Sequence, residues 1–134
     1  MKKIRIIGIS AYFHDSAVAL IENGEIIYAS QEERFSRIKH DSNFPNKALK
    51  NLLETCKLDL IDVDYVVFFE KPFLKFERLL ETYMAFAPKG FKSFSLAMPI
   101  WLREKLFQKK FLFEKLRLHD EKFNDINKIK FSEH

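Results

Sequence analysis

The sequence has almost none of the residues that cross-link small proteins. Cys56 is the single cysteine among 134 residues. An internal disulfide and a zinc site built from cysteines are therefore both excluded. An isolated thiol is typical of proteins in a reducing compartment, so we expect a cytoplasmic protein in which Cys56 belongs to the core.

Long hydrophobic runs are also missing. The apolar run at residues 4–9 is soon followed by His14 and Asp15, so it is too short for a secretory signal peptide. In the aromatic-rich second half, the longest stretch without a charge is residues 93–102. A membrane-spanning helix needs about 20 apolar residues. The sequence therefore predicts neither a signal peptide nor a transmembrane segment.

Charge and aromatic residues are unevenly distributed. The chain carries 23 Lys and Arg against 19 Asp and Glu, and the basic excess lies in the second half. Within residues 71–117, lysines and arginines alternate with phenylalanines and Trp101. This pattern favours a helical insert with solvated lysines over a Phe-rich core, but binding to a membrane surface or an acidic partner stays open. No nucleic acid is expected, because no recognition motif is present.

The first 31 residues predict three consecutive strands. Residues 4–10 are apolar and β-branched, and two further strand-like runs cover residues 16–21 and 25–31. Asn23 and Gly24 separate the second run from the third, and Asn-Gly is the strongest short signal for a hairpin turn. We therefore expect an antiparallel meander, with this turn at the sheet end opposite His14 and Asp15.

The remaining chain predicts helices and further strands, so the fold class is α/β with a mixed sheet. A chain of this size forms one domain and can bury a core. We divide it into a sheet and helix core (1–70), a helical Phe/Lys-rich insert (71–123) and the start of a further strand (128–134). The expected elements are a loop at 32–44, helices at 45–57, 72–87 and 94–118, a polar linker at 124–127, and strands at 63–70 and 129–131.

The turn at residues 10–16 follows a buried strand and is rich in polar groups. Backbone amides with the hydroxyls of Ser10 and Ser16 could hold phosphate oxygens. Asp15 could bind a metal or accept a proton, and His14 could donate one. The same residue types are common in ordinary hairpin turns, so their spacing alone does not decide between the two interpretations.

A second polar segment, residues 31–41, contains three cations and a histidine. Arg34, Arg37, Lys39 and His40 could bind an anionic substrate such as a carboxylate or a phosphate. The alternative is a solvated strand edge whose Glu and Arg side chains prevent pairing with other strands.

Taken together, residues 8–45 (GISAYFHDSAVALIENGEIIYASQEERFSRIKHDSNFP) closely resemble the amino-terminal signature of a carbamoyltransferase family. The family includes NodU-type nodulation proteins and antibiotic O-carbamoyltransferases. The similarity at 63–70, 85–88 and 99–102 is less diagnostic. The resemblance implies the amino-terminal half of an ASKHA-type, ribonuclease-H-like catalytic domain. It also implies a YrdC-like carboxy-terminal domain that is missing from this chain, which we expect to be truncated.

The resemblance also implies a reaction. Family members make a carbamoyl-adenylate from carbamoyl phosphate and ATP, and pass the carbamoyl group to a hydroxyl of a small-molecule acceptor. His14 and Asp15 are then expected at the transfer site. The expected substrate contacts are Ser10, Ser16, Arg34, Arg37, Lys39 and His40. We expect these 134 residues alone to be inactive.

The carboxyl terminus resembles the start of the family's metal motif, in which Ser-Glu-His-His and a further histidine bind a divalent metal, usually iron. Two histidines one helical turn apart face the same way, which suits metal binding. Residues 131–134 match the first half of the motif, and His134 occupies the position of the first ligand. We expect the complete enzyme to use a divalent metal and ATP, and this chain to bind neither.

Overall fold

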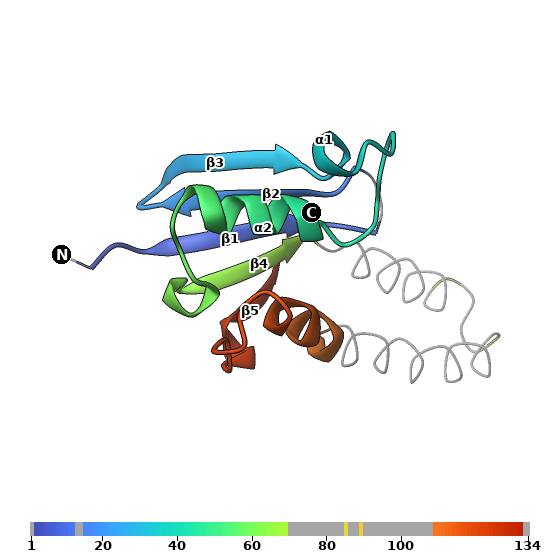
Figure 1. Ribbon diagram of the computed structural model, residues 1–134. Helices are drawn as coiled ribbons and strands as arrows, with labels where there is room; N and C mark the ends of the chain where they lie inside the picture. The colour runs from blue at the N-terminus through green and yellow to red at the C-terminus, as the bar shows by residue number, and fades with distance from the viewer. Residues whose placement is uncertain (1, 13–14, 70–84, 86–88, 90–108, 133–134) are drawn as a thin grey trace.

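The computed structural model contains one five-stranded sheet, with the helix that follows Pro45 and the helical residues 109–117 packed on one face (Figure 1). It describes residues 2–12, 15–69, 85, 89 and 109–132. The strands are β1 (Arg5–Ser10), β2 (Ala17–Glu22), β3 (Glu25–Gln31), β4 (Tyr65–Phe69) and β5 (Ile129–Ser132). The helices are α1 (Glu33–Ser36), α2 (Asn46–Thr55) and the 3-10 turns η1 (Leu60–Asp62) and η2 (Ile126–Lys128), and residues 109–117 are also helical.

The predicted meander is confirmed. β2 pairs antiparallel with both β1 and β3. Asn23 and Gly24 both adopt positive φ, 50° and 85°, as a tight hairpin turn requires. Asn23 also exchanges two hydrogen bonds with Ile4, through its backbone N–H and its side-chain oxygen. These bonds fix the turn at the sheet end opposite the loop between β1 and β2.

The mixed sheet is confirmed as well, because β1, β4 and β5 run parallel in the order β3-β2-β1-β4-β5. The α2 helix follows Pro45 as the sequence predicts. The expected loop at 32–44 was wrong in one respect, since it includes α1, and the linker at 124–127 runs into η2. The helix predicted at 72–87, and the predicted helix at 94–118 as far as residue 108, lie almost entirely outside the described residues.

The core lies between one face of the sheet and the helices. Its helical side consists of two groups, one on α2 and one in residues 112–123. The buried strand residues are Ile7, Ile9, Val18, Leu20, Val66, Phe68 and Ile129, and they pack with Ala48, Leu49, Leu52, Leu112, Leu116 and Phe123. The end of the segment predicted as an insert thus belongs to the core. Within the described part of the chain, no helix is long and apolar enough to cross a membrane.

His119 packs at the amino-terminal end of α2, and we expect it to make stability depend on pH. Its Nε2 lies 3.0 Å from Oδ1 of Asn46, and its ring contacts Phe44. Burial, with a smaller contribution from Lys50, lowers the pKa of His119. Because the pKa of His119 is lower in the folded state, the unfolded chain binds more protons. The free energy of unfolding therefore has its full value above about pH 6.5, the ordinary pKa of histidine, and decreases as the pH drops below that value.

We therefore expect the free energy of urea unfolding to decrease between about pH 7.5 and pH 5, and to decrease less in His119→Gln. The carboxyls of Glu22, Asp41 and Asp64 do not confound this interval, because their pKa values are lowered and they titrate in more acidic solution. Equal pH slopes for the two proteins would contradict the assignment.

Candidate functional site

The two polar segments identified in the sequence meet at one end of the sheet. Tyr12 donates its backbone N–H to the carbonyl of Ser42 at 2.6 Å. Ser16 donates both its backbone N–H and its hydroxyl to the carbonyl of Asp41, at 2.8 and 3.1 Å. The loop after β1 and the loop after α1 are thus held together by two backbone N–H groups and the Ser16 hydroxyl, and Ser16 is completely buried between the loops.

Asp41 stabilises the conformation of the loop after α1. Its Oδ1 accepts hydrogen bonds from the backbone N–H and the side-chain amide of Asn43, at 3.0 and 2.9 Å. A hydrogen bond from the Ser36 hydroxyl, followed by those from Asn43, holds the pKa of Asp41 below its usual value. Only 6% of the residue is exposed, so the carboxylate serves to hold the conformation of the loop.

Asp15, Glu33 and His40 converge on the outer side of this junction. Oδ1 of Asp15 lies 2.9 Å from Nδ1 of His40, and Oε2 of Glu33 accepts the backbone N–H of His40 at 2.9 Å. One donor atom from each side chain lies within 4.8 Å of the others. Carboxylate oxygens and an imidazole could hold a divalent cation. Here, however, Asp15 and His40 already use their facing atoms for each other.

The other predicted site residues that the structure describes lie outside the cluster formed by Asp15, Glu33 and His40. Ser16 bonds to protein rather than facing outward, whereas Arg34, Arg37 and Lys39 are exposed. Within the described residues, these three cations form no ion pair. His14 and His134 lie outside the described residues. The substrate-binding and catalytic roles of the whole set stay predictions.

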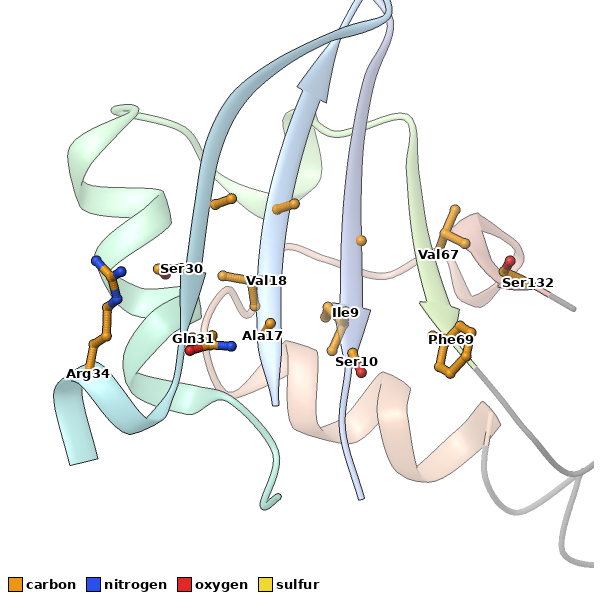
Figure 2. A pocket seen from close by; sticks show the side chains of 13 residues that line it. Ile9, Ser10, Ala17, Val18, Ser30, Gln31, Arg34, Val67, Phe69 and Ser132 are labelled. Atoms are coloured by element: carbon orange, nitrogen blue, oxygen red, sulfur yellow. The ribbon is translucent and has the colours of Figure 1, made fainter. Parts of the chain in front are cut away.

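A cavity of about 710 Å³ lies on the sheet face opposite the core (Figure 2). It is lined by several small residues, Gly8 and Ala19 among them, and Phe69 lies at one side. Ser10, at the end of β1, and Arg34, on α1, line it at the end near the loop junction. The cavity therefore connects two of the predicted substrate contacts with the open face of the sheet.

Sequence reasoning missed Glu32. The alternative of a solvated strand edge would leave this side chain in water, but it is buried, and only 4% of the residue is exposed. Its carboxylate accepts the backbone N–H groups of Ala48 and Lys47, at 2.7 and 3.2 Å. Those groups belong to the first turn of α2, so Glu32 caps this helix from the end of β3.

The loop junction and the whole sheet fall within a single family match. Residues 5–134 match the family described as Carbamoyltransferase N-terminus. The chain belongs to this family. It is similar to protein sll1178 of Synechocystis sp., with 52% identity over 130 residues, which is 96% of this chain and 21% of that protein.

Shorter similarities reach more distant proteins. The nodulation protein NolNO of Sinorhizobium fredii is 33% identical over 60 residues, covering 45% of this chain and 9% of that protein. Protein MJ1051 of Methanocaldococcus jannaschii is 38% identical over 53 residues, covering 40% of this chain and 10% of that protein. The chain thus spans about a fifth or less of the length of these three relatives.

Proposed function

We propose that the chain is the amino-terminal part of a carbamoyltransferase that transfers a carbamoyl group from carbamoyl-adenylate to a hydroxyl of a small-molecule acceptor. The adenylate would come from carbamoyl phosphate and ATP. The family match over residues 5–134 carries this proposal. The transfer site would lie at the junction of the two polar loops, with Asp15 and its sequence neighbour His14 as catalytic residues. The 134-residue chain would be inactive by itself.

The chemistry at the junction supports the proposal. A hydroxyl becomes a nucleophile when a positioned group accepts its proton, and the Asp15 and His40 pair offers such a group. An adenylate carries negative charge. Arg34, Arg37 and Lys39 are exposed nearby on α1 and the loop that follows it, where their donors could bind phosphate oxygens.

The sheet topology supports a location for the proposed metal, which the family resemblance implies is usually iron. Ser10 of β1 is in register with Phe69 of β4, and Phe69 with Ser132 of β5. Parallel strands present their carboxyl ends at one sheet edge, where ligands of such sheets bind. β5 therefore ends at Ser132, at the same end of the sheet as β1, from which the loop containing Asp15 emerges. His134, the proposed first ligand, follows Ser132 by two positions in the sequence. A bound divalent metal would supply a Lewis acid there.

The direct test compares the complete gene product with the 134-residue chain for consumption of carbamoyl phosphate and ATP. We expect the complete product to consume ATP only when carbamoyl phosphate is present, and the shorter chain to consume neither. ATP consumption by the complete product that does not depend on carbamoyl phosphate would contradict the proposal.

A further inference from the structure

The pair formed by Asp15 and His40 is more firmly held than its exposure suggests. The two residues are 25 positions apart, and they are the neighbours of Ser16 and Asp41. Ser16 and Asp41 are joined by two hydrogen bonds in the buried part of the junction. The exposed pair is thus placed by a buried connection one residue further along each loop.

The backbone of His40 is fixed on its other side as well. Its N–H donates to the Glu33 carboxylate at 2.9 Å, and its φ of 57° lies in the left-handed region. A residue other than glycine holds this conformation only when its surroundings enforce it. The backbone bond to Glu33 fixes the position of His40, and the bond to Asp15 fixes the direction of its imidazole.

The hydrogen bond at Nδ1 determines where the imidazole can accept a proton. An ionised carboxylate only accepts hydrogen bonds, so Nδ1 of His40 must carry the proton that lies between it and Asp15. In the neutral ring the free lone pair is then on Nε2. The His40 side chain is 71% exposed, so Nε2 is accessible to a molecule bound at the junction.

We propose that His40 is the proton acceptor of the transfer reaction and that Asp15 is a positioning residue that keeps His40 in the Nδ1–H tautomer. This rests on the proposed function. The acceptor's hydroxyl proton moves to Nε2, and its oxygen forms a bond to the carbamoyl carbon. The bond from that carbon to the phosphate oxygen of the adenylate breaks, and the phosphate oxygen takes the electron pair.

The tautomer of His40 can be measured without an assay of enzymatic activity. Long-range ¹H–¹⁵N spectra of the 134-residue chain at about pH 8.5 report which ring nitrogen of a neutral histidine is protonated. We expect Nδ1–H for His40 in the wild type and a shift towards Nε2–H in Asp15→Ala. Glu33→Gln is the matched control, because Glu33 contacts the backbone of His40 and not its ring. It should keep the wild-type tautomer.

The catalytic half of the proposal is tested in the complete gene product. His40→Ala should slow single-turnover transfer by about 10²-fold or more, and adding Asp15→Ala should cost little further, because both act through one imidazole. An Nε2–H tautomer in the wild type, or no change of tautomer in Asp15→Ala, overturns the positioning role. Wild-type transfer by a folded His40→Ala overturns the role of His40 and leaves the proposed function intact. A complete product without transfer activity overturns the proposed function, whatever the tautomer.

Discussion

Replacing Glu32 with alanine should lower the free energy of unfolding of this chain by about 3 kcal/mol, measured by urea denaturation at neutral pH. The substitution removes the acceptor for the backbone N–H groups of Lys47 and Ala48. Ala48 is completely buried, so its N–H cannot bond to water instead. A buried donor without a partner costs about 1 to 3 kcal/mol, and the favourable interaction of a carboxylate with the helix amino terminus is lost in addition.

Two further variants separate this explanation from general effects of losing a glutamate. Glu32→Gln keeps one oxygen acceptor and should recover part of the stability. Glu54→Ala removes an exposed glutamate from α2 and should change the free energy of unfolding by less than about 0.5 kcal/mol. If Glu32→Ala were no more destabilising than Glu54→Ala, the capping role would be wrong.

Glu32 also shows which features the sequence could predict. The hairpin followed from Asn23 and Gly24, whose preference for positive φ is a local property of two adjacent residues. The helix after Pro45 followed from apolar spacing. The partners of Glu32 are 15 and 16 residues away, on an element of another kind. No local pattern marks such a residue, and the general tendency of glutamate towards solvent pointed in the wrong direction.

The same argument applies to the candidate site. The sequence indicated that the two polar segments carry chemistry, and by residue type it selected Asp15 and His40. It did not predict that they contact each other, because their pairing depends on the bonds between Ser16 and Asp41. Nor did it predict α1, which consists of four residues and places Glu33 beside the backbone of His40. Contacts between distant loops are properties of the folded chain.

The largest functional effect is expected in the complete gene product, where His14→Ala and Asp15→Asn should each slow carbamoyl transfer by about 10²- to 10⁴-fold. Both variants should leave formation of the carbamoyl-adenylate almost unchanged. The reason is that the two steps are expected to take place in different domains. The family resemblance assigns adenylate formation to a YrdC-like domain, whereas the loop containing Asp15 and the His40 imidazole to which it bonds belong to the proposed transfer site.

Single-turnover transfer from supplied carbamoyl-adenylate to the acceptor isolates the second step, and adenylate formation is measured separately from carbamoyl phosphate and ATP. Asp59→Asn is the matched control, since it makes the same chemical change at an exposed position before η1 and should transfer at the wild-type rate. Urea unfolding of each variant shows whether the fold survives. Loss of both steps together would indicate a general defect. Wild-type transfer rates in stable His14→Ala and Asp15→Asn proteins would show that the two residues are parts of an ordinary turn. Removing a positioned proton donor, or the residue that orients the proton acceptor, must slow the step that it serves.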